Sequence, residues 1–141
     1  MVRILDCLLA ASEPDDKPPL EMSPKELGRF GEKIAFHFFE ARGYYVLERN
    51  YTTIVGEADI IALDKDELVF IEVKTRIGDE QMEAEEAVTT AKQTTYEKLA
   101  IIYTTNFDEY ETIRFDVVAI TVQNNNEGLL RHIKNAYYFD E

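Results

Sequence analysis

The chain has 141 residues, of which 45% are hydrophobic and 30% are charged, and its formal net charge is −13. This length argues for one domain with one adequate core, and no apolar run approaches the length of a membrane span, which disfavours a membrane partner. The single cysteine, Cys7, excludes an internal disulfide and a cysteine zinc cluster, and it favours a cytoplasmic location.

The predicted elements run from an N-terminal arm into a mixture of helices and strands. Residues 1–22 hold three prolines and no sustained periodicity, so we expect a flexible extension before a domain at 23–141. Ser23-Pro24-Lys25-Glu26 has the form of a capping box and starts a helix that ends at Gly43. The elements predicted after it are a strand at 44–51, a hairpin at 56–76, a helix at about 87–103, a strand at 112–122 and a peripheral strand at 129–139. This order, α-β-β-β-α-β with an added strand, predicts an α/β fold with a mixed sheet between helices.

The hairpin at 56–76 carries an acid on each strand, because Asp59 opens one apolar run and Glu72 closes the other. A four-residue turn at 64–67 would place these two acids directly opposite each other. Opposed residues have Cβ atoms roughly 4.5–5.5 Å apart, and like charges at that separation destabilise a sheet. The pair therefore predicts a hard divalent cation, Mg²⁺ or Mn²⁺, held by Asp59 and Glu72.

Lys74 follows Glu72 by two residues, so strand alternation places both side chains on one face. Ile71 and Val73 then point into a core on the other face. The alternative is that Glu72 and Lys74 form a solvated pair and that Asp59 only marks the start of a strand. The second strand is too apolar for a solvated edge, which favours the metal site.

Several other residues are candidates around this site. Glu32 lies at the border of the apolar stripe of the first helix, where it is either solvated or, if the helix packs across the hairpin, close to the Asp59–Glu72 pair. Glu57 either shares a face with Asp59 or is a plain loop acid. Arg76, Lys92 and Gln93 are candidates for contacts with a nucleic-acid backbone or an attacking water. The alternative is that these side chains are simply solvated.

Asp116 has a cation two residues before it, Arg114. We interpret Asp116 either as the structural partner of that cation or as a turn acid.

Several stretches together resemble the PD-(D/E)XK nuclease superfamily, and more closely the YraN-like family of predicted bacterial endonucleases, akin to archaeal Holliday-junction resolvases. The matching stretches lie at 28–32, 43–44, 50–51, 56–62, 69–76, 114–118 and 132–137. The resemblance covers about residues 26–138. It implies a restriction-endonuclease-like α-β-β-β-α-β core, with a mixed sheet flanked by helices.

The resemblance also implies roles for residues of this chain. Asp59 and Glu72 would ligate Mg²⁺ or Mn²⁺, Lys74 would position or activate the attacking water, and Glu32 would complete the catalytic set. This chemistry is metal-assisted hydrolysis of a phosphodiester. We therefore expect a metal-dependent endonuclease that acts on DNA, with branched or damaged DNA as candidate substrates and a homodimer as the expected assembly.

The strongly negative charge favours a different function. Nucleic-acid binding draws affinity from Lys and Arg on phosphates, whereas residues 79–86 contain five acids and no base. Thr52 also stands where relatives tend to carry a basic residue. The alternative is a nuclease-like binding or assembly module with weak or no catalysis, bound to a basic protein partner.

Overall fold

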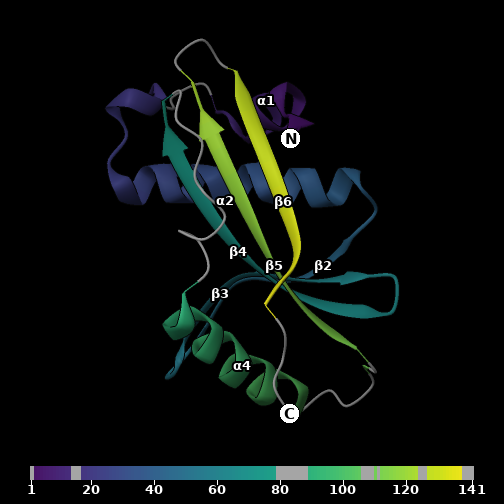
Figure 1. Cartoon of the computed structure of the whole chain (residues 1–141). Helices are drawn as coiled ribbons and strands as arrows, with labels where there is room; N and C mark the ends of the chain where they lie inside the picture. The colour runs from purple at the N-terminus through teal and green to yellow at the C-terminus, as the bar shows by residue number, and fades with distance from the viewer. Residues whose placement is uncertain are drawn as a thin grey trace.

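The computed structural model confirms the predicted order of helices and strands (Figure 1). It describes residues 2–13, 17–78, 89–105, 110, 112–123 and 127–137. The elements are β1 Val2–Arg3, α1 Leu5–Ala11, η1 Pro19–Glu21, α2 Pro24–Ala41, β2 Tyr45–Thr53, β3 Gly56–Asp64, β4 Glu67–Ile77, α4 Thr90–Thr105, β5 Ile113–Val122 and β6 Gly128–Tyr137. The acidic run at 79–86, the predicted helix start at 87 and the end of the last predicted strand lie outside the described residues.

A six-stranded mixed sheet forms the centre of the fold, in the order β1-β6-β5-β4-β3-β2. β4 and β5 are parallel and are connected through α4, and the other neighbouring strands are antiparallel. Strand alternation divides the core in two, with one cluster beneath α1 and α2 and the other beneath α4. The protein is therefore a mixed α/β structure, as the sequence predicted.

The last strand is less peripheral than predicted. β1 pairs with Leu129 and Leu130 of β6 and covers that edge of the sheet. Leu130 is fully buried, because Ile4 and Leu8 of the N-terminal segment pack in the same cluster. The prediction missed this because Val2–Arg3 is too short to be recognised as a strand from its own sequence.

The long helix α2 begins and ends where the sequence predicted. The hydroxyl of Ser23 accepts from the N–H of Glu26 at 3.1 Å, and the Glu26 carboxylate accepts from the N–H of Ser23 at 3.0 Å. This capping box satisfies two backbone donors that would otherwise lack partners. Gly43 follows the helix with a φ of +84°, the left-handed conformation that glycine adopts without strain.

The turn of the β3–β4 hairpin is shorter than the predicted four-residue turn. Asp64 pairs with Glu67, so only Lys65 and Asp66 form the turn. The Nη1 atom of Arg114 donates to Asp64 at 2.9 Å and to Glu67 at 2.7 Å. This shared guanidinium bridges the two acids of the last pair, which lengthens the ladder by one pair relative to the prediction without changing its register.

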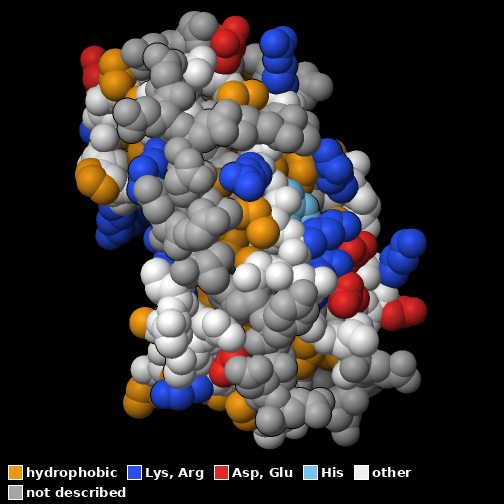
Figure 2. Space-filling model, viewed as in Figure 1, with side chains coloured by type: hydrophobic (Ala, Val, Ile, Leu, Met, Phe, Trp, Pro, Cys, Tyr) orange, Lys and Arg blue, Asp and Glu red, His pale blue; other side chains and the backbone are white. Residues whose placement is uncertain are grey.

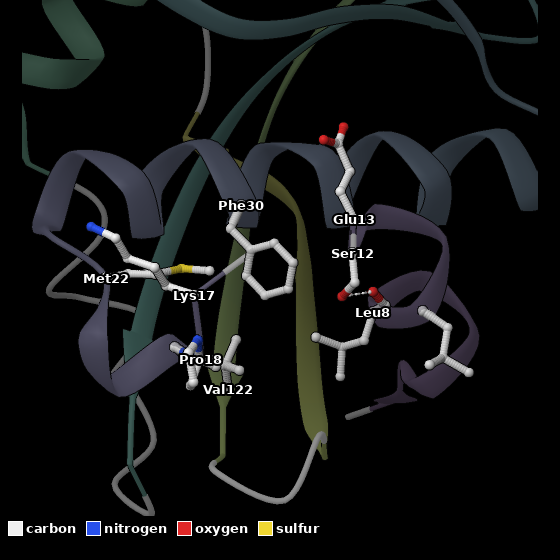
Figure 3. Close-up of a pocket in the computed structure, with 10 residues that line it drawn as sticks. Leu8, Ser12, Glu13, Lys17, Pro18, Met22, Phe30 and Val122 are labelled. Atoms are coloured by element: carbon white, nitrogen blue, oxygen red, sulfur yellow. Dashed lines mark hydrogen bonds between the residues drawn. The ribbon is translucent and has the colours of Figure 1, made fainter. Parts of the chain in front are cut away.

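The N-terminal segment packs against the domain through Ile4, Leu8 and Ala11, each at most 3% exposed. A pocket of about 400 Å³ remains between α1, η1 and α2, and Phe30 points into it (Figure 3). The flexibility of residues 1–22 stays a prediction.

No helix among the described residues is long and apolar enough to cross a membrane.

Candidate functional site

The candidate site lies where β3 and β4 stop pairing. Their ladder runs from Asp64–Glu67 to Ile60–Ile71 and then ends. Beyond this point β3 stays paired with β2, and β4 stays paired with β5. Figure 1 shows the N-terminal part of β3 and the C-terminal part of β4 running apart from the crossing of the strands.

Asp59 occupies the opening between the two strands. The predicted register is correct, so Asp59 and Glu72 are the first opposed residues past the end of the ladder. The carboxylate of Asp59 accepts a hydrogen bond from the N–H of Val73 at 2.8 Å. The side chain therefore replaces the backbone acceptor that β3 no longer offers to β4.

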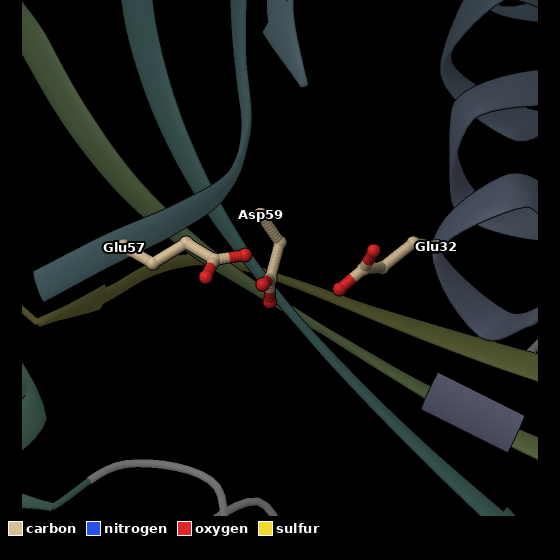
Figure 4. A group of neighbouring side chains, drawn as sticks. All are labelled: Glu32, Glu57 and Asp59. Carbon is tan, nitrogen blue, oxygen red and sulfur yellow. The ribbon is translucent and has the colours of Figure 1, made fainter. Parts of the chain in front are cut away.

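Two further acids converge on Asp59, as Figure 4 shows. Glu57 precedes it by two residues on β3, and Glu32 comes from α2. One carboxylate oxygen from each of the three acids lies within 4.8 Å of those of the other two. Glu32 therefore lies at the site, as one of the two interpretations of its sequence position predicted. Glu57 lies there as well.

Asn50 of β2 links two of these carboxylates. Its amide nitrogen, turned toward the acids, donates to Glu57 at 3.1 Å and to Glu32 at 2.9 Å. The opposite orientation would place the amide oxygen against two carboxylates. Sequence reasoning did not select Asn50, although the matching stretch at 50–51 contains it. Asn50 also has a φ of +54°, a backbone conformation that is uncommon for residues other than glycine. Only the structure reveals this unusual backbone.

Burial, reinforced by the charges of neighbouring carboxylates, makes Asp59 and Glu32 unusually weak acids. Burial raises the pKa of Asp59 to about 7, and the charges of Glu72, Glu32 and Glu57 act in the same direction. The hydrogen bond from Val73 opposes this shift but does not cancel it. Burial also raises the pKa of Glu32. A group of carboxylates with this cost of ionisation is stabilised by any cation that binds it.

Glu72 is buried, at 7% exposed, and is paired with two lysines. Lys92 of α4 donates to its Oε1 atom, and the Nζ atom of Lys74 lies 3.7 Å from the same oxygen. The neighbouring Lys92 ammonium and burial hold the pKa of Lys74 below its usual value. Burial disfavours the charged form of Lys92. The contacts of the Lys92 ammonium group with Glu72 and Lys74 outweigh this effect of burial and raise the pKa of Lys92.

The remaining candidates lie around this centre. Arg76 is exposed on β4, and the amide of Gln93 donates to Glu97 at 3.4 Å. Their contacts with a substrate stay predictions. Glu72 does not belong to the group of described acids whose ligand atoms lie within 4.8 Å of one another, so the ligand pair Asp59–Glu72 also stays a prediction.

Arg114 and Asp116 form a separate structural network. The Nε atom of Arg114 donates to Asp116 at 2.9 Å, and the Nε2 atom of His132 lies 2.7 Å from the same carboxylate. Both Arg114 and Asp116 are at most 5% exposed. The interpretation of Asp116 as a structural partner of Arg114 is confirmed.

The donor set fits a hard divalent cation. Glu32, Glu57 and Asp59 offer carboxylate oxygens at close range, which are the ligands that Mg²⁺ and Mn²⁺ prefer. Burial raises the pKa of Asp59 and of Glu32, so the fold holds these two carboxyl groups where ionisation is costly. The arrangement can therefore bind such a cation next to the ammonium groups of Lys74 and Lys92.

Comparison with known proteins gives a consistent result. Residues 31–120 match the model of the uncharacterised protein family UPF0102. The chain is 40% identical over 117 residues to a UPF0102 protein of Thermodesulfovibrio yellowstonii, which covers 83% of this chain and all of that protein. It is 41% identical over 109 residues to a UPF0102 protein of Dictyoglomus thermophilum, covering 77% of this chain and 92% of the other. A UPF0102 protein of Chlorobium phaeobacteroides is 42% identical over 120 residues, covering 81% and 95%.

Proposed function

The chain belongs to the uncharacterised protein family UPF0102, and from that premise we propose that it is a divalent-cation-dependent endonuclease that hydrolyses phosphodiester bonds of DNA. The observation that carries the proposal is the convergence of Glu32, Glu57 and Asp59 beside the strand that bears Glu72 and Lys74. The resemblance of these stretches to the PD-(D/E)XK nucleases supplies the reaction class. The element order from α2 to β5 supports a restriction-endonuclease-like core.

The acids would hold Mg²⁺ or Mn²⁺, which when bound polarises the phosphate and lowers the pKa of a water. Asp59 is the central ligand because it faces Glu32 and Glu57 on one side and Glu72 on the other. Its raised pKa means that cation binding releases a proton near neutral pH. Metal affinity should therefore rise as the pH passes about 7.

Lys74 is the residue suited to the attacking water. It lies on the same strand as Glu72, and its side chain is 37% exposed, so the ammonium is accessible to substrate. A compact ammonium acts as a point charge beside a developing oxyanion. Because its pKa is lowered, Lys74 also has a larger neutral fraction than an ordinary lysine, and the neutral amine can accept a proton.

The net charge of −13 is a cost for any DNA-binding protein. Figure 2 shows Lys and Arg side chains from the top to the bottom of the face in view, with Asp and Glu side chains among them. We propose branched or damaged DNA as the substrate class, since locally opened strands present phosphates that a small site can reach.

Cleavage of a panel of labelled junctions, flaps, nicked duplexes and single strands tests this proposal. The wild-type protein should cleave at least one substrate with Mg²⁺ or Mn²⁺ and none with EDTA. Lys74→Ala and Asp59→Asn should reduce the rate by at least about a hundredfold, the scale of a lost general acid–base group. Lys98→Ala provides a matched control, because Lys98 is exposed on α4. Equal background traces for all four proteins on every substrate would refute the proposal.

A nuclease-like binding or assembly module is the second candidate function, favoured by the charge of −13. In that case a purified basic protein partner would bind wild type and Asp59→Asn equally, whereas short DNA would not bind at 150 mM salt. Cleavage that depends on Asp59 would exclude this candidate as the whole function.

A further inference from the structure

We propose that Lys92 is a built-in counter-ion of Glu72, which a divalent cation displaces when it binds to Asp59 and Glu72, so that metal loading releases the first turn of α4. The inference rests on the proposed function, because it describes how the same site is regulated. It assigns Lys92 a role in metal occupancy rather than in contact with a substrate.

The first support is the placement of Glu72. This acid is 7% exposed, and a buried carboxylate requires a compensating charge. Among the described residues, Lys92 donates to its Oε1 atom and Lys74 lies 3.7 Å from the same atom. The positive charge that Glu72 needs is therefore supplied by lysines of the chain itself.

The second support is the position of Lys92 in its helix. The N–H of Lys92 donates to the hydroxyl of Thr89 at 3.1 Å, and the N–H of Gln93 donates to the Thr89 carbonyl at 2.9 Å. Thr89 thus caps α4 and leaves Lys92 in the first turn. The helix dipole disfavours a cation there, so Lys92 is held by Glu72 against its local preference. Loss of that partner removes the main reason for the ammonium to stay.

The two lysines differ in how readily they can leave. Lys74 is fixed to β4, two residues from Glu72, and therefore remains close to the site. Lys92 reaches Glu72 from α4, an element that is not tied to β4 by backbone pairing, and its side chain is partly exposed, as is that of Lys74. A divalent cation on Glu72 would repel both ammonium groups, and Lys92 is the one that can move away.

Manganese binding measured by electron paramagnetic resonance tests the inference without relying on activity. Lys92→Met keeps the length of the side chain and removes the competing charge, so Mn²⁺ should bind about tenfold tighter or more, the factor that one charge-assisted hydrogen bond is worth. Lys98→Met removes the same charge from an exposed position on the same helix and should change the affinity less than about twofold. Lys92→Gln provides a second variant if Lys92→Met does not fold.

Two further measurements separate the outcomes. In a Glu72→Gln background, Lys92→Met should no longer change Mn²⁺ affinity. Hydrogen exchange of the amides at 92–96 should accelerate when Mn²⁺ is added to wild type, and should be insensitive to Mn²⁺ in Lys92→Met. Equal Mn²⁺ affinity in wild type and Lys92→Met would overturn the role of Lys92 and leave the nuclease proposal standing. No Mn²⁺ binding to any variant would overturn both.

Discussion

The backbone N–H of Val73 donates to the carboxylate of Asp59 at 2.8 Å, across the opening where β3 and β4 separate. The same side chain therefore closes a gap in the sheet and belongs to the acid group of the candidate site. These two roles make opposite demands. The structural role needs only an acceptor, whereas cation binding needs a charge.

Asp59→Asn should stabilise the metal-free protein at neutral pH. The pKa of Asp59 is about 7 in the folded protein, against a reference value of 3.8. Between these values the folded protein binds a proton that the unfolded chain does not, so wild-type stability falls as the pH rises. Asparagine retains an acceptor for Val73 without the charge.

Urea unfolding in EDTA at pH 4, 5.5 and 8 measures this effect. The gain should be on the order of 4 kcal/mol at pH 8 and should approach zero near pH 4. Asp66→Asn, at the exposed hairpin turn, provides the control and should show no such trend. A gain that does not change with pH would contradict the assignment.

Gly31→Ala should destabilise the protein because α2 crosses β4 without room for a side chain. A Cβ atom at Gly31 would lie 1.6 Å from the hydroxyl and 2.7 Å from the Cβ of Thr75. The expected loss is about 1–3 kcal/mol, as for other overpacked cores. Gly28→Ala is the matched control, because nothing lies within 4 Å of a Cβ there. That variant should gain about 0.5–1 kcal/mol from helix propensity. Thermal and urea unfolding of the two variants should change in opposite directions.

Arg114→Met should be among the most destabilising substitutions. The guanidinium is 5% exposed and donates to Asp64, Glu67 and Asp116. Its removal leaves a buried carboxylate without its cation, which costs about 3–5 kcal/mol. The control Arg131→Met removes an exposed cation and should change the free energy of unfolding by less than about 0.5 kcal/mol.

The loss in Arg114→Met should also depend on pH. Burial opposes ionisation of Asp116, but its bonds to His132 and Arg114 outweigh that and lower its pKa. The stabilisation from this acid is therefore present above its ordinary pKa and is lost as the pH falls through the lowered value. Urea unfolding of both proteins at pH 3 and pH 7 should show a smaller difference at pH 3. An equal difference at both values would indicate that packing, rather than charge, dominates.

Leu8→Ala should show that the N-terminal segment is part of the folded domain. Leu8 is 3% exposed within the main core, and its truncation should cost about 2–4 kcal/mol. Leu9, the next residue, is 60% exposed, so Leu9→Ala should cost less than about 0.5 kcal/mol. If both variants unfold like wild type by calorimetry, the segment contributes nothing to stability.

Local signals were sufficient to predict much of the fold. The box at Ser23 and Glu26 fixed the start of α2, and two apolar runs separated by a polar turn fixed the register that sets Asp59 opposite Glu72. These features depend on residues close in sequence. The turn was predicted too long because Asp64 and Glu67 also pair, and both bind Arg114, a contact across 47 residues that the local sequence does not reveal.

The site required tertiary information that sequence patterns do not contain. Glu32 reaches Asp59 from α2, which lies so close to β4 that a Cβ atom at Gly31 would clash with Thr75. Lys92 reaches Glu72 from 20 residues away. Asn50 belongs to the site because its side-chain amide donates to Glu57 and Glu32, which lie on other elements. The sequence could name most of these residues as candidates, but it could not say which of them meet.

The short β3–β4 ladder has a mechanical consequence. Five residue pairs join β3 to β4, whereas β4 is paired with β5 from Leu68 to Ile77. Past these five pairs, Glu57 and Asp59 lie on one diverging strand and Glu72 and Lys74 lie on the other. A cation bound by both Asp59 and Glu72 would therefore cross-link two strands at the point where their backbone ladder has ended.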